Sequence, residues 1–168
     1  MPMRGIYNET GQHGNYDDAE PVWKAAVVVA PGDLIFRDTD GYDKPVSNYT
    51  WDTNIATTAG TLNALFRGVS MARRIAGQTA DGGKADGLII FTGEFTMACT
   101  ALGTAAAPGA LVSFEDDGTS HIANQKVRVT ATAGEAFGRV SRDAAVGATF
   151  LTFKLLTPLM FGGPTAAA

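Results

Sequence analysis

The sequence predicts an all-β protein: a small β-barrel or β-sandwich-like domain built from a duplicated β unit, with an extended N-terminal arm. Segment 30–38 (APGDLIFRD) returns 77 residues later at 107–116 (APGALVSFED), and segment 66–70 (FRGVS) returns as 137–141 (FGRVS). The returning residues are mostly apolar, Gly and Pro, which are scaffold residues. Short apolar runs closed by Gly, Asp and Pro turns lie around them, a pattern typical of barrels and sandwiches.

The chain divides into an arm at 1–21, a β domain at 22–160 and a flexible C-terminal tail at 161–168. Gly, Asn and acidic residues disfavour regular structure in the arm. The two halves of the β domain, 22–97 and 98–157, repeat one plan. Each half has a strand, an Asp and Gly turn, a strand that carries the Phe and Gly motif, and a last apolar strand.

Apolar and β-branched runs give the expected strands. In the first half they lie at 22–29, 34–36, 45–47, 65–71 and 88–97, of which the last is the longest candidate. Polar residues at 48–60 predict a loop, with room for one helical turn within 55–65. In the second half the strands are expected at 110–115, 126–130, 135–141 and 149–156.

Composition limits the possible partners. The 168 residues are 45% hydrophobic, enough to fill one core, and 18% charged. The net charge of −4 and the lack of a dense Lys and Arg run argue against a nucleic-acid partner. The single cysteine, Cys99, allows no intrachain disulfide. No apolar run is long enough to span a membrane and no secretory signal is visible, so we expect folding in a cytoplasm.

No residue pattern predicts catalysis or a metal site. The two histidines, His13 and His121, have no Cys or His at ligand spacing. Cys99 lies at the end of an apolar strand, where a buried thiol is commoner than a nucleophile. The repeated Ser70 and Ser141 lie at strand ends, where hydroxyls bond to nearby backbone. We therefore expect a protein that is not an enzyme and that holds no cofactor or metal.

Aromatic and basic residues in or beside loops are the candidates for a protein interface, because interfaces are enriched in aromatic residues and Arg. The arginines suit an acidic protein surface. For the tryptophans the alternative is core packing, and for the arginines it is a solvated face. The candidates are Tyr7, Tyr16, Trp23, Tyr49, Trp51, Arg73 and Arg74.

The order of the motifs resembles that of the capsid cement, or head-decoration, proteins of tailed bacteriophages. The resemblance covers about residues 22–157 and rests on the motifs at 27–36, 66–77, 87–95, 107–112 and 137–155. It implies a structural virion protein that binds the outer surface of an assembled capsid and stabilises it, after synthesis in the host cytoplasm. The implied partners are the major capsid protein and further copies of this chain, as a trimer or dimer.

Three alternatives remain open at this point. A tail or fibre component would assemble with itself in the absence of a capsid. A carbohydrate-binding β module would need an exposed aromatic platform, for which Tyr49 and Trp51 are the candidates. An enzyme would need Cys99 or Ser141 as its nucleophile.

Overall fold

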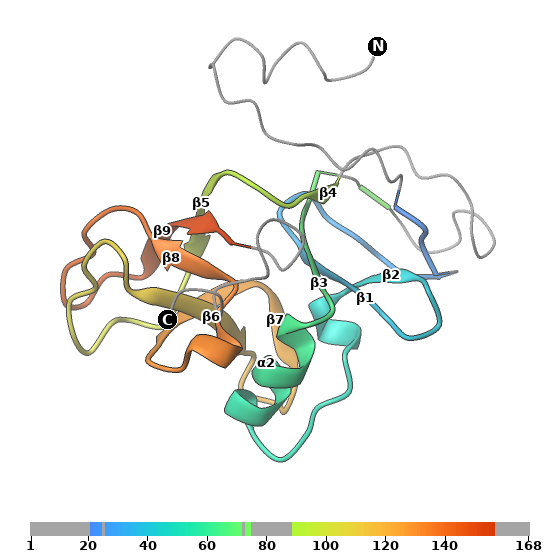
Figure 1. Cartoon of the computed structure of the whole chain (residues 1–168), viewed down its shortest axis with the longest axis horizontal. Coiled ribbons are helices and arrows are strands. Elements are labelled where there is room, and N and C mark those ends of the chain that lie inside the picture. Colours follow the sequence, from blue (N-terminus) through green and yellow to red (C-terminus); the bar gives the residue numbers. More distant parts are fainter. Residues whose placement is uncertain (1–20, 25, 72, 75–88, 157–168) are drawn as a thin grey trace, which may run out of the picture.

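The computed structural model describes residues 21–24, 26–71, 73–74 and 89–156 (Figure 1). Within these residues the chain forms two β structures and one α-helix, which confirms the all-β prediction. The expected arm, apart from its last residue, and the expected tail lie outside the described residues.

The first β structure is a four-stranded sheet and the second is a closed barrel of five strands. The sheet contains β1 (Leu34–Arg37), β2 (Asp43–Pro45), β3 (Phe66–Ser70) and β4 (Ile89–Ile90). The barrel contains β5 (Glu94–Ala98), β6 (Leu111–Asp116), β7 (Ile122–Thr130), β8 (Gly138–Val140) and β9 (Phe150–Leu155). The helices are η1 (Val46–Asn48), α2 (Ile55–Asn63) and η2 (Ala133–Glu135).

The two β structures follow the same path. The strand order of the sheet is β2-β1-β3-β4, and the barrel contains the matching order β7-β6-β8-β9, to which β5 is added. Within this shared order, every two neighbouring strands pair antiparallel. We call the described residues of 21–90 the first unit and residues 94–156 the second unit. The equal strand order supports the duplicated β unit that the sequence predicts.

The repeated Pro and Gly motif makes the same turn in both units. In each unit the residue after the glycine donates its amide to the alanine carbonyl before the proline, at 3.1 Å. Gly32 and Gly109 adopt φ angles of 92° and 94°, in the left-handed region that favours glycine. Proline fixes its own φ near the value that the second residue of a type II turn requires. Glycine supplies the positive φ of the third residue, so the Pro–Gly pair selects a type II turn. This local chemistry explains why the turn is kept in both units.

The second repeated motif is shifted by one residue relative to the sequence alignment. Gly68 of β3 lies opposite Ile35, and Gly138 of β8 lies opposite Val112, so these two glycines are equivalent. The pairing of β1 with β3 is irregular beside Gly68, where Arg67 is passed over. Arg67 is therefore the extra residue of the first unit.

This shift corrects the apparent repeat of serines. The Ser70 carbonyl accepts a hydrogen bond from the turn glycine of its unit at 2.7 Å, and the Val140 carbonyl does the same in the second unit at 2.8 Å. Ser70 is thus equivalent to Val140 and not to Ser141. The two serines share a sequence motif but no common structural position.

The expected long strand at 88–97 is wrong. Ile89–Ile90 belongs to the sheet as β4, and the chain then turns into the barrel as β5. Gly93 lies between them with a φ of 133°, which breaks the strand. Among the described residues the longest strand is β7, with nine residues. Apolar residues continue through the break because both short strands contribute to buried regions.

Strand β5 closes the barrel of the second unit. It pairs antiparallel with β9 over five residues and parallel with β7 through Ala98 and Lys126. In the first unit a related parallel bridge joins Trp23 to Asp43 of β2. The described residues of the first unit show no further pairing that would close a barrel. Among the described residues, the second unit thus forms a closed barrel and the first unit a four-stranded sheet.

The main hydrophobic core is shared by both units. It includes Leu34, Phe36 and Phe66 from the sheet and Phe114 and Phe137 from the barrel. The rings of Phe66 and Phe137 lie 4.7 Å apart between centroids, so the contact crosses the boundary between the units. A second, small cluster lies within the first unit and contains Trp23, Val27, Val29 and Ile35.

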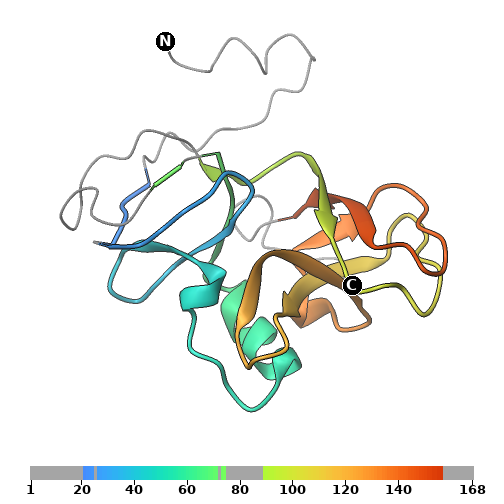
Figure 2. The same ribbon diagram turned by 180° about the vertical axis from the view of Figure 1, so that it is seen from behind.

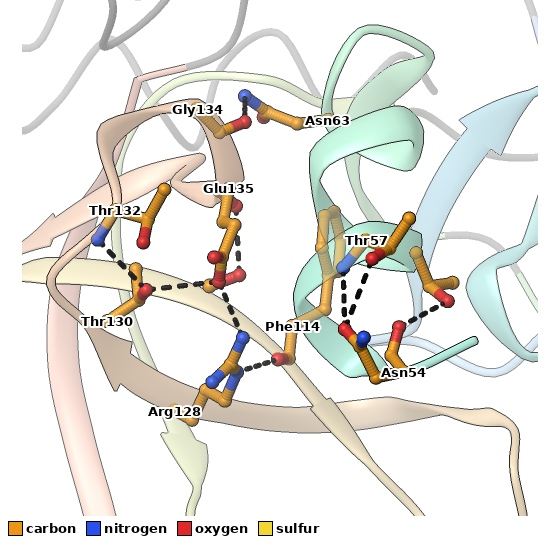
Figure 3. A network of polar contacts seen from close by, with 11 residues as sticks. Asn54, Thr57, Asn63, Phe114, Arg128, Thr130, Thr132, Gly134 and Glu135 are labelled. Carbon is orange, nitrogen blue, oxygen red and sulfur yellow. Dashed lines mark hydrogen bonds and ion pairs between the residues drawn. The ribbon is translucent and has the colours of Figure 1, made fainter. Parts of the chain in front are cut away.

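A polar network joins the units beside the main core (Figure 3). The Arg128 guanidinium donates to the Glu135 carboxylate at 2.6 Å, and the Thr130 hydroxyl donates to the same oxygen at 3.1 Å. Asn63, at the end of α2, donates its side-chain amide to the Gly134 carbonyl at 3.1 Å. Because α2 belongs to the first unit and η2 to the second, the bond from Asn63 joins the two units, while the bonds from Arg128 and Thr130 hold η2 within the second unit.

Two further contacts join the units. The Gln125 side chain donates to the Asp33 carboxylate at 2.8 Å, and the Ser47 amide donates to the Asn124 side chain at 2.8 Å. Helix α2 itself is capped by Asn54, whose side-chain oxygen accepts from the Thr57 amide at 2.9 Å. The helix is longer than the single turn for which the sequence left room.

Candidate protein interface

Two large apolar side chains of the second unit are exposed. Val146 is 66% exposed and Phe150 is 61% exposed. Phe150 begins β9 on its outer face, opposite Ala98 of β5. Its neighbours on this face, Thr152 and Lys154, are polar. Full burial of one such apolar side chain is worth about 1.5–3 kcal/mol, so a partner that covers both would gain binding free energy.

Both side chains belong to a surface that we call the second-unit loop end, which consists of residues 99–110 and 144–150. Neither segment contains a charged residue. Backbone hydrogen bonds of 2.8–3.0 Å join the two segments, donated by the amides of Cys99, Leu102, Ala106, Ala144 and Gly147. Since these backbone groups are already paired, ordering the two segments for a partner costs little entropy.

A polar row borders this surface on the barrel wall. The hydroxyls of Thr96 and Thr152 lie 2.9 Å apart across β5 and β9. The Arg142 guanidinium donates to the Glu94 carboxylate at 2.6 Å. The Ser141 hydroxyl and this guanidinium lower the pKa of Glu94, so the carboxylate stays charged at neutral pH. An apolar centre with a polar border is the usual anatomy of a protein interface.

The first unit carries a counterpart, which we call the first-unit loop end: residues 26–32 and 73–74. Val29 and Arg74 exchange backbone hydrogen bonds of 2.9 and 2.8 Å, as Ala106 and Ala144 do in the second unit. Val28, beside this bridge, is 57% exposed. Val28 in the first unit and Val146 in the second therefore lie within two residues of equivalent bridges, but the first-unit loop end also carries Arg73 and Arg74.

The structure places the predicted interface residues in several environments, and Tyr7 and Tyr16 lie outside the described residues. Trp23 is fully buried in the small cluster of the first unit, so here it is a core residue that offers no surface to a partner. Arg74 is 4% exposed, because its backbone bridges to Val29 and the side chain is covered. Arg73 is exposed.

Tyr49 and Trp51 are half-buried. Both pack against the main core. The Tyr49 ring meets Phe36 edge-on, with 5.3 Å between centroids, and burial raises the pKa of its hydroxyl. The seven predicted residues therefore do not form one patch among the described residues. The exposed Val28, Val146 and Phe150 were not among the predicted residues.

One sequence signal could have identified Phe150. The last strand reads FLTFKL, and its alternate residues Leu151, Phe153 and Leu155 are buried. The period of two puts Phe150 on the opposite face, with Thr152 and Lys154. An aromatic residue in the polar register of an alternating strand indicates an exposed apolar site.

Two side chains of the described residues that could react, the Cys99 thiol and the Asp117 carboxylate, lie in surroundings that disfavour reaction or order the local backbone. The Cys99 thiol is buried, and burial raises its pKa, which disfavours the reactive thiolate. Asp117 accepts from the amides of Thr119 and His121 at 2.8 and 3.3 Å, so it orders its own loop. In the part of the chain that the structure describes, no three metal-binding side chains gather at one place.

The comparisons with known proteins add no relative. No family model matches the sequence, and no curated protein matches it. Among the described helices none is long and apolar enough to cross a membrane. The function must therefore be argued from the surface itself.

Proposed function

We propose that this chain is a structural virion protein that binds the outer surface of an assembled phage capsid and stabilises it. The observation that carries the proposal is the second-unit loop end, an uncharged surface that exposes Val146 and Phe150. The resemblance of the motifs to capsid cement proteins names the partner, the major capsid protein. Further copies of this chain, as a trimer or dimer, are the second partner.

The proposed action is thermodynamic. A protein that binds the assembled shell but not its dissociated subunits stabilises the shell by mass action. Each loop end offers a modest apolar contact, but a capsid repeats that contact many times. The paired backbone of the loop end favours this role, because a rigid surface loses little entropy on docking.

Of the alternatives, the carbohydrate-binding module has no supporting observation. It requires an exposed aromatic platform, whereas the rings of Tyr49 and Trp51 pack against the main core. A tail or fibre component would use the same apolar surface for contacts between copies of this chain. The behaviour of the purified chain distinguishes that case.

The test is co-sedimentation of the purified chain with empty shells of the virus that encodes it, combined with gel filtration of the chain alone. We expect binding that saturates at a copy number compatible with capsid symmetry, and a rise in the melting temperature of the shell. Tubes or rings of the chain alone, with no binding to shells, would contradict the proposal and favour a tail component.

A further inference from the structure

The outer face of β9 continues from the exposed Phe150 along the side of the barrel. Strand β9 pairs with β5 on one side and with β8 on the other, and the three strands lie side by side at the left of Figure 1 and at the right of Figure 2. Along β9, buried Leu151, Phe153 and Leu155 alternate with the residues of the outer face. We call this face the β9 wall, which consists of Glu94, Thr96, Ala98, Arg139, Phe150, Thr152 and Lys154.

The β9 wall has an apolar row at one end and a charged row at the other. Phe150 lies opposite Ala98 of β5, next to the second-unit loop end. Four residues further along β9, Lys154 lies opposite Glu94 of β5 and Arg139 of β8. Each strand residue advances by about 3.3 Å, so the two rows are roughly 13 Å apart.

The charged row carries an excess of cations. Arg139 lies directly opposite Lys154, and like charges at such positions destabilise a sheet. The carboxylate of the row, on Glu94, already binds the Arg142 guanidinium at 2.6 Å. Within the described part of the chain, neither Arg139 nor Lys154 takes part in a salt bridge. The row therefore has unused capacity for a further carboxylate.

The two cations differ in how firmly they are held. The Arg139 guanidinium donates to the Gly109 carbonyl at 3.0 Å, and Gly109 belongs to the second-unit loop end. One cation of the row is thus fixed beside the apolar surface. The Lys154 side chain is exposed and can adjust to a partner.

We propose that the docking surface extends from the second-unit loop end over the β9 wall, and that the partner subunit presents a carboxylate to Arg139 and Lys154. This inference rests on the proposed function and gives the partner surface its chemistry. That surface carries an apolar patch for Phe150 and an acidic side chain roughly 13 Å from it. The carboxylate would offset the repulsion between the two cations and accept charge-assisted hydrogen bonds from them.

The two rows would contribute differently to binding. The contact of Phe150 gains free energy by removing apolar surface from water, and salt does not screen it. The contact of the cations depends on ionic strength, sets the orientation of docking and speeds association. Binding should therefore have one component that salt weakens and one that it does not.

The experiment measures binding of the purified chain to empty shells of the encoding virus in about 0.05 M and about 0.5 M NaCl, where the screening lengths differ severalfold. Lys154→Gln removes one cation, and the matched control Ala56→Glu makes the same change of net charge on the exposed side of α2. At low salt we expect Lys154→Gln to bind about fivefold more weakly than the control. This difference should nearly vanish at high salt.

Two further variants test the sign of the charge and the apolar row. Glu94→Gln removes the carboxylate that repels an acidic partner, so it should bind about twofold more tightly than the wild-type chain at low salt. Phe150→Ser should lose affinity by a similar factor at both salt concentrations. The melting temperature of each free variant is measured first, and Lys154→Ala replaces Lys154→Gln if that variant is less stable than the wild-type chain.

The outcomes separate this inference from the proposed function. If Lys154→Gln binds like the control at both salt concentrations, the acidic partner is wrong and the proposed function stands. Weaker binding of Glu94→Gln would mean that the partner presents a cation to the wall, which also overturns the inference. If the wild-type chain does not bind shells at either salt concentration, the inference and the proposed function fail together.

Discussion

The two units share a chain path, but their described residues form a four-stranded sheet in the first and a closed barrel in the second. In the second unit, β9 has six residues and offers a long ladder to β5, so the barrel closes. In the first unit, β4 has two residues and β2 has three. Turns and glycines are kept in both units and determine the path. Among the described residues, the strands of the sheet are shorter than those of the barrel, and the interior residues differ.

The interiors of the units differ at one matched pair of residues. On the first hairpin Arg37 lies opposite Asp43, and on the second Phe114 lies opposite Val127. The Arg37 guanidinium holds the fully buried Asp43 carboxylate with bonds of 3.0 and 2.8 Å. Asp43 also accepts from the Val22 amide at 2.8 Å, which ties the start of the unit to β2. An ion pair thus takes the place that apolar packing has in the barrel.

The largest effects are expected at the equivalent glycines. A Cβ at Gly68 would meet the Ile90 carbonyl, and its φ of 141° adds strain; a Cβ at Gly138 would lie 2.8 Å from the Lys154 carbonyl oxygen. We expect Gly68→Ala and Gly138→Ala each to lower the free energy of unfolding by about 3 kcal/mol or more. Chemical denaturation measures both.

The control for the glycine pair is Gly134→Ala, where a Cβ meets nothing within 4 Å. It should change stability by less than about 0.5 kcal/mol. A large loss at Gly138 together with a neutral Gly68→Ala would show that the two glycines have different roles, and would break the equivalence of the units.

The matched interior pair gives the next effect. Asp43→Val removes a buried carboxylate and leaves Arg37 without it, which should cost about 3 kcal/mol. The double variant Arg37→Phe with Asp43→Val copies the pair of the second unit. We expect it to recover at least about 1 kcal/mol of that loss, because apolar residues can replace a buried ion pair. A double variant less stable than Asp43→Val alone would show that the interiors are not interchangeable.

Helix α2 lies where the second unit has only the short η2, and its cap is a milder test. Asn54→Ala removes the acceptor for the Thr57 amide and should lower the free energy of unfolding by about 1 kcal/mol. Asn54→Asp keeps an acceptor and serves as the control, with an expected change close to zero. Equal losses in the two variants would mean that the cap does not stabilise the helix.

The smallest effect is expected in the first hairpin at acid pH. The Lys44 ammonium lowers the pKa of Asp38 below its ordinary value of 3.8. A carboxyl whose folded pKa is lowered contributes stability above its unfolded pKa and loses that contribution as pH falls through the folded value. The melting temperature should thus fall below about pH 4, and less steeply in Lys44→Gln. Parallel curves for the two proteins would contradict this.

The sequence predicted what local chemistry determines. The Pro–Gly turns follow from the restricted φ of proline and the freedom of Gly32 and Gly109, and both appear as expected. The break at Gly93 was missed, because apolar residues continue on both sides and periodicity cannot show which sheet a strand joins. The one-residue shift around Arg67 was missed because only the ladder partners reveal it.

The candidate surface was harder to predict than the fold. The burial of Trp23 depends on Val27, Val29 and Ile35, and no local pattern brings those residues around it. The exposure of Val28 likewise depends on how the chain is oriented at the bridge between Val29 and Arg74, which are far apart in the sequence. Only Phe150 carried a usable signal, through the alternation of its strand. Long-range packing, rather than residue type, separates core from interface here.

The most direct test of the proposed function is hydroxyl-radical footprinting of the chain alone and bound to shells, read by mass spectrometry at Val146 and Phe150. The free chain exposes both side chains, so both should be oxidised. We expect both to be protected on the shell, whereas the exposed residues of α2 remain reactive. Protection of α2 with unchanged oxidation at Val146 and Phe150 would contradict the claim that the second-unit loop end is the docking surface.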